Sequence, residues 1–288
     1  MTSATVTGRH AGKPLGGPLT LAVAGSGARG AAYAELATRR PERCRVVAVA
    51  EPHEPARTAF ASRHGLADEA VFISWQHLAA APRLADAVVV AVVDDQHVDA
   101  ALAFIERGYD ILLEKPIATT ADGCQVIAEA AAAAGVAVRI CHVMRHTDYT
   151  CALKAELACE NDGADHQVVA IEYDGGVTAS FTLSAFTPLE HRRTRIFGTH
   201  GQLTGDGRFL EIFDFRSERR TVVDTSNDGS TQAEGHAGGD QRLVDDFVDR
   251  LLSGRRDLIM DQLPQTVDSH RVVFAAERAR REGRIVTL

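Results

Sequence analysis

The stretch Leu19–Gly30, "LTLAVAGSGARG", decides the fold of the N-terminal half. Its apolar run predicts a buried strand, and Gly25, Gly27 and Gly30 follow with G-x-G-x-x-G spacing. The first glycine permits a tight turn, the second lets a pyrophosphate approach the backbone, and the third lets helix and strand pack closely. A helix that begins here points its N-terminus at the anion. The stretch therefore predicts a dinucleotide-binding βαβ unit.

Short apolar segments alternate with helical patterns up to about Cys141. Continuous Val, Ala and Leu runs are typical of strands covered on both faces, and spacers of helical length are typical of parallel crossovers. Strands are expected in the segments Leu19–Gly25, Arg45–Glu51, 71–75, Asp86–Val93, 110–115 and 136–143. We therefore predict an α/β fold that begins with a doubly wound parallel (Rossmann) sheet over residues 19–145.

The pattern changes after about Tyr149 to alternating β-branched and aromatic residues. The segment "HQVVAIEYDGGVTASFTLSAFT" predicts a hairpin around Asp174, Gly175 and Gly176. Further alternating segments favour a mostly antiparallel sheet with one open face, and two helical patterns close the chain. We therefore predict a smaller α+β domain over residues 146–288, and a flexible tail over residues 1–18.

Composition limits the class of function. The chain of 288 residues is 45% hydrophobic and 24% charged, which is typical of a globular protein. Its net charge of −8 disfavours a nucleic-acid partner and an anionic membrane surface, and no apolar run is long enough to cross a bilayer. Five cysteines without a C-x-x-C pair predict neither a zinc site nor a disulfide framework. We therefore expect no metal centre and a reducing cytoplasm.

The acidic residue Glu51 ends the second predicted strand, where a carboxylate can bind both ribose hydroxyls of NAD and repel the 2′-phosphate of NADP. NAD is therefore favoured, although Arg29, His53 and Arg57 stand near enough in sequence to accept that phosphate and leave NADP open. Enzymes that use S-adenosylmethionine share the glycine turn and the acidic residue, so they are a further alternative. The predicted cofactor contacts in this part of the chain are Gly25, Ser26, Gly27, Ala28, Arg29, Gly30 and Glu51.

A second group of polar residues stands where the fourth and fifth predicted strands end. Its members are Asp94, Asp95, His97, Glu114, Lys115 and Pro116. In an open parallel sheet, ligands bind beyond the carboxyl ends of the strands. A lysine there can hydrogen-bond the substrate oxygen whose carbon exchanges hydride, with Glu114 orienting the ammonium and Pro116 restricting Lys115 to an extended conformation. A solvated ion pair at a strand end is the alternative for Glu114 and Lys115.

These residues carry a resemblance to the glucose–fructose oxidoreductase / inositol dehydrogenase (Gfo/Idh/MocA) family. It rests on "GSGARG", "VAVAEP", "AVVDDQHVDAALAFIERGYDILLEKPIA" and "HQVVAIEYDGGVTASFT…RRTRIFGTHG", with the E-K-P segment as the most specific element. The resemblance implies that the N-terminal half binds NAD(P), that Lys115 lies at the reacting centre and that Pro116 follows a cis peptide bond. It also implies that Asp94 and His97 line the cofactor side and that Arg145 lies near the substrate.

The resemblance further implies an oxidoreductase that transfers hydride between a nicotinamide cofactor and a polyol, sugar or similar hydroxylated small molecule. It implies a homo-oligomer that associates through the C-terminal sheet, within residues 146–288. Catalysis is then assigned to Lys115 and Glu114, which also join the cofactor contacts. Substrate contacts are assigned to Lys115, Arg145 and His236.

One part of the family pattern is missing. Relatives carry a G-x-H-x-x-D-like signature whose histidine is the general acid/base, whereas residues 151–165, "CALKAELACENDGAD", lack it and predict a shortened second domain. His142, His146 and His236 are candidate substitutes for proton transfer. His236 and Asp240 stand at a helix entrance that either faces the active cleft or only caps the helix. The departure leaves open a catalytically silent nucleotide-binding protein with a regulatory or assembly role.

Overall fold

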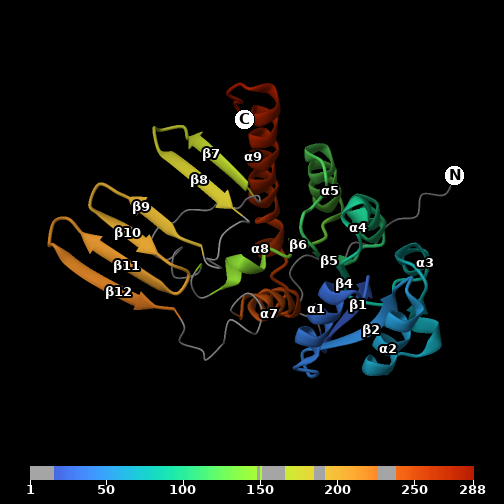
Figure 1. The fold of residues 1–288 in the computed structure, drawn as a ribbon. Helices are drawn as coiled ribbons and strands as arrows, with labels where there is room; N and C mark the ends of the chain where they lie inside the picture. Colours follow the sequence, from blue (N-terminus) through green and yellow to red (C-terminus); the bar gives the residue numbers. More distant parts are fainter. Residues whose placement is uncertain (1–15, 148–149, 151–165, 185–191, 226–237) are drawn as a thin grey trace. The chain divides into compact units, whose positions relative to one another are not determined.

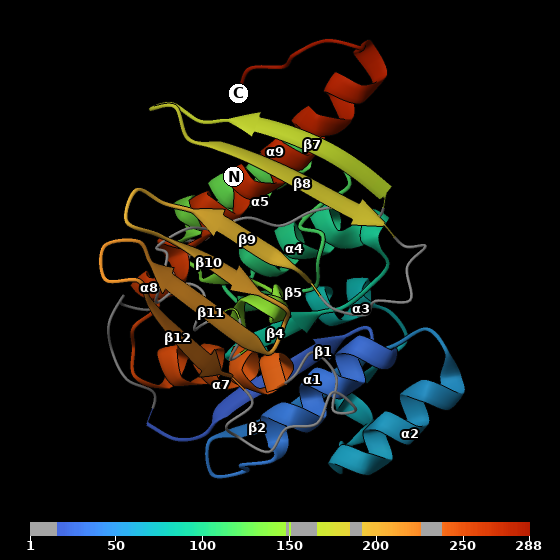
Figure 2. The same ribbon diagram turned by 60° about the vertical axis from the view of Figure 1, so that its left-hand side comes forward.

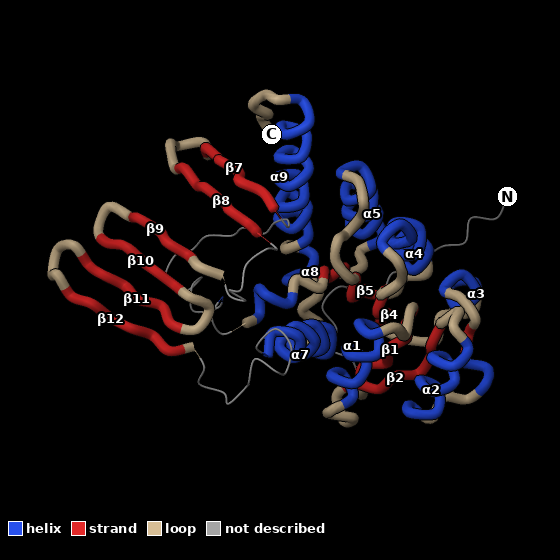
Figure 3. Tube along the Cα trace, in the orientation of Figure 1, coloured by secondary structure: helices blue, strands red, loops and turns tan. Residues whose placement is uncertain are grey.

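The chain folds into two compact units in a computed structural model that describes residues 16–147, 150, 166–184, 192–225 and 238–288. The first unit comprises Met1–Val143 and Asp240–Arg271, and the second comprises Met144–Gly239 and Val272–Leu288. Figure 1 labels the helices and strands along the chain, and Figure 3 separates helices from strands by colour.

A parallel sheet with the strand order β3-β2-β1-β4-β5-β6 forms the centre of the first unit. Its strands are β1 (Leu19–Ala24), β2 (Cys44–Ala50), β3 (Val71–Phe72), β4 (Ala87–Val90), β5 (Asp110–Leu113) and β6 (Val138–Ile140). Every residue of β4 and β5 is buried, as expected for strands between two helical layers. The predicted doubly wound sheet is confirmed. The ends of β4 and β5 are neighbours, since Val90 pairs with Leu113.

Helices connect these strands and cover the sheet. They are α1 (Ala28–Thr38), α2 (Glu54–His64), α3 (Trp75–Ala80), α4 (His97–Glu106) and α5 (Ala121–Ala134), with short turns η1 (Asp68–Ala70) and η2 (Asp94–Gln96). Helix α4 packs against both α3 and α5, which lie beside it in Figures 1 and 2. Local sequence sets the ends of α5, because the Thr120 hydroxyl accepts a hydrogen bond from the Gly123 amide and Gly135 adopts a left-handed φ of 63°.

Residues Asp240–Arg271 belong to the first unit, which corrects the predicted division at residue 146. They include most of α7 (Gly239–Leu252), all of α8 (Asp257–Met260) and the start of α9 (Leu263–Glu282). One side of α7 buries Leu243, Val244, Phe247, Val248 and Leu251. Arg256 pairs with Asp110 on β5, and Arg139 on β6 pairs with Asp246. Contacts between residues so distant in sequence leave no local pattern, so the division could not be read from the sequence.

The second unit contains the predicted hairpin. Strand β7 (His166–Glu172) pairs antiparallel with β8 (Thr178–Ser184), with Ile171 opposite Ala179. Gly175 and Gly176 in the turn have φ values of 97° and 82°, a region that glycine adopts without steric cost.

A second antiparallel sheet in this unit has the strand order β12-β11-β10-β9. Its strands are β9 (Thr194–Phe197), β10 (Gly201–Gly205), β11 (Phe209–Asp214) and β12 (Arg219–Asp224). Leu203 and Leu210 form the buried core of one face, with Ile212 and Val223 packed against them. Alternation along the strands puts Phe197 and Val222 on the other face, where they are 66% and 57% exposed. The prediction of an antiparallel sheet with an open face is confirmed.

Two predicted features fall outside the described residues. The tail predicted over residues 1–18 does so except for residues 16–18, and the segment 151–165 does so completely. Among the helices that are described, none combines the length and the apolar character needed to cross a membrane.

The Arg256–Asp110 pair gives a test of the corrected division. Asp110 is 3% exposed, and burial raises its pKa while Arg256 lowers it, so removing the guanidinium leaves a buried carboxylate without its cation. We expect Arg256→Met to lower the free energy of unfolding by about 3–5 kcal/mol at pH 7. The loss is smaller in acid, because burial favours the neutral carboxyl and protonation removes the uncompensated charge. Chemical denaturation at several pH values measures both effects.

Two further variants serve as controls. Arg255→Met removes the exposed neighbouring arginine and should change the free energy of unfolding by less than about 0.5 kcal/mol. Adding Asp110→Asn to Arg256→Met should recover part of the stability. An Arg256→Met protein as stable as the Arg255→Met protein would contradict the assignment of this segment to the first unit.

Candidate functional site

The glycine loop follows β1 and leads into α1. Gly25 has a φ of 89°, and a Cβ there would lie 2.4 Å from the carbonyl oxygen of Ala91. A Cβ on Gly30 would lie 1.9 Å from the Gly25 carbonyl oxygen, so α1 crosses the loop too closely for any side chain at this position. A Cβ on Gly27 would meet nothing within 4 Å. The first and third glycines are thus required by the packing of the fold. The second is exposed and leaves the backbone of the loop accessible to a ligand.

The N-terminus of α1 suits an anion. Gly27 and Ala28 are exposed, and no side chain caps the helix at Gly27. The first turn contains no acidic residue. The amide groups at the start of a helix have no partner inside the helix, and the helix dipole adds a positive potential there. The residues present therefore fit the pyrophosphate of a dinucleotide.

The carboxylate of Glu51 lies directly beside this loop. Its Oε2 accepts a hydrogen bond of 2.8 Å from the Ser26 amide, and its Oε1 accepts one of 2.9 Å from the His53 amide. Glu51 is 8% exposed and Ser26 is 6% exposed. The predicted neighbours Ser26 and Glu51 are thus in contact. Arg57 donates to the backbone carbonyls of Glu51 and Pro52.

Lys115 stands at the carboxyl end of β5, the strand next to β4 in the sheet. It is exposed, and the Lys115–Pro116 peptide bond is cis, as the resemblance implied. The role predicted for Glu114 needs correction. Its carboxylate does not contact the Lys115 ammonium but accepts a hydrogen bond of 2.6 Å from the Lys115 backbone amide. Glu114 thus holds the main chain of Lys115, and the ammonium makes no hydrogen bond or ion pair with any residue that the structure describes.

His97 is buried and contacts the E-K-P segment through the Pro116 carbonyl oxygen. It is 0% exposed, its Nδ1 lies 2.6 Å from the Pro116 carbonyl oxygen, and its Nε2 lies 3.2 Å from the Val92 carbonyl oxygen. The ring is therefore buried, and the implied place of His97 on the cofactor side stays a prediction. Its hydrogen bond fixes Pro116. Asp94 is exposed in η2, so it stays a predicted cofactor contact.

A second histidine, His270, contacts Ile117, the residue after Pro116. The His270 Nε2 accepts a hydrogen bond of 3.3 Å from the Ile117 amide, while its Nδ1 lies 2.9 Å from the Thr266 carbonyl oxygen. These contacts fit the neutral ring with its hydrogen on Nδ1. His142 stacks on His270 with ring centroids 5.4 Å apart. His270 had no sequence signal, because its partner Ile117 is 153 residues away.

The remaining predicted residues belong to the second unit or lie outside the described residues. Arg145 and His146 are half-buried in η3 (Val143–His146), which the division of the chain places in the second unit from Met144 onward. His236 lies outside the described residues. The predicted substrate contacts of Arg145 and His236, and proton transfer by His142, His146 or His236, stay predictions.

Arg29 forms its ion pairs with Glu114 and Asp240. Its guanidinium pairs with Glu114 at 2.8 Å and with Asp240 at 2.6 Å, and it also donates to the Tyr33 hydroxyl. Tyr33 was not assigned to the site from the sequence, whereas Asp240 was left open between a place facing the active cleft and a helix cap. The spacing of four residues between Arg29 and Tyr33 on one helix was a usable signal for Tyr33. The pairing of Asp240 with Arg29, 211 residues away, had no sequence signal.

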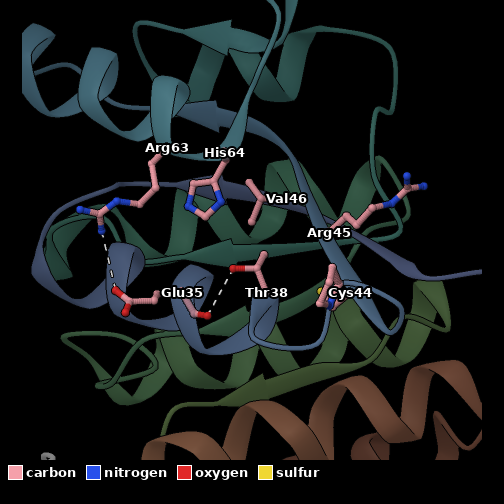
Figure 4. Close-up of a pocket in the computed structure, with 8 residues that line it drawn as sticks. Glu35, Thr38, Cys44, Arg45, Val46, Arg63 and His64 are labelled. Carbon is pink, nitrogen blue, oxygen red and sulfur yellow. Dashed lines mark hydrogen bonds and ion pairs between the residues drawn. The ribbon is translucent and has the colours of Figure 1, made fainter.

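A hollow of about 560 Å³ lies elsewhere in the first unit (Figure 4). It is lined by Glu35, Thr38, Pro41, Cys44, Arg45, Val46, Arg63 and His64. These residues stand at the start of β2 and the ends of α1 and α2, at the edge opposite the glycine loop. Burial raises the pKa of the Cys44 thiol to about 12, so the hollow offers no thiolate at neutral pH. In the part of the chain that is described, no cluster of His, Cys, Asp and Glu suited to a metal ion occurs.

The glycines of the loop are expected to differ in their effect on folding. Gly30→Ala forces a Cβ onto a backbone carbonyl, so we expect the free energy of unfolding to fall by about 3 kcal/mol or more. Gly27→Ala adds a methyl group in open space at an ordinary φ of −61°, so we expect a loss below about 1 kcal/mol. Urea denaturation of the two variants checks this, and equal losses would contradict the steric argument.

Comparison with known proteins agrees with this geometry. The model of the GFO_IDH_MocA oxidoreductase family, with an NAD-binding Rossmann fold, matches residues 19–142. The inositol 2-dehydrogenase of Ralstonia nicotianae is 36% identical over 117 residues, which cover 41% of this chain and 34% of that protein. The matched part of the chain thus spans about a third of the length of this curated relative.

Solved structures share the fold over a longer stretch. An inositol dehydrogenase homolog of Azotobacter vinelandii, complexed with NADH and myo-inositol, aligns with a TM-score of 0.71 at 14% identity, covering 91% of this chain and 95% of that chain. The biliverdin reductase of Synechocystis, in complex with biliverdin and NADP+, aligns with a TM-score of 0.66 at 15% identity, covering 89% and 99%. Residues 19–142 of this chain therefore match the model of the Gfo/Idh/MocA oxidoreductase family, with its NAD-binding Rossmann fold.

Proposed function

We propose that this protein is an NAD-dependent dehydrogenase that acts on a polyol, a sugar or a similar hydroxylated small molecule. The exposed amine of Lys115 carries the proposal. It follows β5 at the same edge of the parallel sheet as the glycine loop after β1, with β4 between these two strands. An amine with a fixed backbone, at the edge where this type of sheet binds ligands, suits a group that contacts a substrate oxygen.

NAD is proposed as the cofactor in preference to NADP. The Glu51 carboxylate lies at the loop, where it can accept hydrogen bonds from ribose hydroxyls and repel a 2′-phosphate. Arg29 is paired with Glu114 and Asp240, so its charge is already compensated within the protein. When bound, NAD supplies the acceptor for the hydride. The uncapped start of α1 supports binding of the pyrophosphate.

Lys115 is the proposed acid/base group. Its amine hydrogen-bonds the reacting hydroxyl of the substrate and takes up the hydroxyl proton as the carbon loses its hydride. In the reverse direction, the ammonium returns that proton to the carbonyl oxygen. Glu114 keeps the Lys115 backbone in place, and His97 keeps the Pro116 carbonyl in place. Substrate contacts from Arg145 and His236 are part of the proposal.

The polyol class is supported by the relatives. The Ralstonia protein is named an inositol 2-dehydrogenase, and the Azotobacter structure contains myo-inositol. Myo-inositol is therefore the first substrate to test, followed by other cyclic and linear polyols and by sugars.

Two variants should separate chemistry from cofactor binding. Lys115→Ala removes the acid/base group, so we expect turnover to fall by about 10²–10⁴-fold with the dissociation constant for NADH unchanged within about threefold. Glu51→Ala removes the ribose contact, so we expect weaker NAD+ binding and a preference for NAD+ over NADP+ reduced by about tenfold, equivalent to about 1.4 kcal/mol. Calorimetry measures binding, and absorbance at the nicotinamide band measures turnover.

The same measurements address the catalytically silent alternative, which the missing histidine signature of residues 151–165 favours. Binding of NAD(H) without hydride transfer to any polyol or sugar would favour a regulatory or assembly role. Equal loss of binding and turnover in Lys115→Ala would contradict its role as the acid/base group. If calorimetry detects no binding of either coenzyme, both the dehydrogenase and the silent nucleotide-binding protein are contradicted.

We also propose that the protein forms a homo-oligomer through the open face of the sheet β9–β12. Phe197 and Val222 are exposed on this face. Phe213 lies on the same face, because Phe197 and Phe213 both pair with Gln202 of β10, which stands between them. Exposed aromatic and β-branched residues on one sheet face suit burial against a second copy. We expect Phe197→Glu to lower the oligomeric state in sedimentation velocity runs. Ile285→Glu, at a residue that is 91% exposed, should not. A wild-type monomer would contradict the proposal.

A further inference from the structure

One guanidinium joins three distant segments of the first unit. Arg29 in the first turn of α1 donates from Nε to the Glu114 Oε1 at 2.8 Å and from one terminal nitrogen to the Asp240 Oδ1 at 2.6 Å. Glu114 follows β5, and Asp240 stands in the first turn of α7. Arg29 thus connects the helix that begins at the glycine loop to the end of β5 and to the segment that returns to this unit late in the sequence.

Glu114 uses both carboxylate oxygens in this arrangement. Its Oε1 accepts from Arg29 and, at 2.7 Å, from the Tyr33 hydroxyl. Its Oε2 accepts from the Lys115 backbone amide at 2.6 Å. A carboxylate held from one side by two donors can place the third donor accurately, because rotation of the group would break the other two bonds. The position of Lys115 therefore depends on Arg29 through Glu114.

Arg29 and Tyr33 both stay protonated in this network. Burial alone would lower the pKa of Arg29, but hydrogen bonds to Asp240 and Glu114 raise it above its ordinary value. Burial raises the pKa of Tyr33, so its hydroxyl stays a donor to Glu114. The side chains of Glu114 and Asp240 are 9% and 13% exposed and that of Arg29 is 37% exposed, so the carboxylates are shielded from water and the guanidinium is partly solvated. Asp240 completes the network, because without it the guanidinium has one carboxylate fewer to hold its orientation.

We propose that Arg29 and Asp240 are positioning residues for Lys115, which they hold at a set distance from the dinucleotide loop through Glu114. The inference rests on the proposed function, since it assigns a purpose to the position of the Lys115 amine. It differs from a purely structural role of Arg29 in attaching α7. A structural attachment changes stability, whereas a positioning role changes the surroundings of the Lys115 amine when coenzyme binds.

The low number of lysines makes the test direct. The sequence contains three lysines, Lys13, Lys115 and Lys154. Reductive methylation with ¹³C-formaldehyde gives each one a separate NMR signal, and Lys115→Arg identifies that of Lys115. In the wild type, we expect saturating NADH to shift the Lys115 signal. In Asp240→Asn, we expect this shift to fall below half its wild-type size, with the dissociation constant for NADH unchanged within threefold by calorimetry. Asp240→Glu, which keeps the charge, should recover part of the shift.

Asp249→Asn is the matched control on the same helix. It removes the ion pair of Asp249 with Arg43, which lies outside the network, so the NADH-induced shift should equal that of the wild type. A wild-type shift in Asp240→Asn would overturn the inference and leave the proposed function standing, as would equal losses in Asp240→Asn and Asp249→Asn. NADH binding without any response of Lys115 in the wild type would overturn the role of Lys115 itself. Absence of NADH binding would overturn the proposed function, and this inference with it.

Discussion

The close crossing of α1 over the glycine loop is the constraint on which the rest of the site depends. Gly30 lies so near the Gly25 carbonyl that no Cβ fits between them, and this sets where α1 begins relative to β1. The same crossing directs the first amides of α1 toward the edge at which the strands end. It also places Arg29, in the first turn, within reach of Glu114. The start of α1 and the contact of Arg29 with Glu114 thus depend on one close approach between backbones.

Much of the fold was readable from the sequence, because its patterns are local. Buried runs such as β4 and the hairpin of β7 and β8 were expected where they occur, since period and turn residues act over a few positions. The return of Asp240–Arg271 to the first unit was not, because it depends on pairs such as Arg256 with Asp110. Charged residues are common on helix surfaces, and nothing in a single sequence tells which of them will find a buried partner.

The site shows the same division between local and distant causes. The glycine loop, Glu51 and the place of Lys115 at the end of β5 followed from spacing and strand order. The directions of side chains did not. Glu114 was expected to face the Lys115 ammonium, yet Arg29 and Tyr33 compete for its carboxylate and turn it to the backbone. His97 was expected to line the cofactor side, yet its ring lies in the core between the carbonyl oxygens of Pro116 and Val92.

The return of Asp240–Arg271 to the first unit has a consequence for biosynthesis. A ribosome releases the strands of the parallel sheet long before it releases α7, with the whole antiparallel unit in between. Until then, Asp110 and Arg139 lack the Arg256 and Asp246 side chains that pair with them. The first unit therefore completes its folding only after Asp240–Arg271 has been synthesised, unlike a domain formed from one continuous stretch of chain.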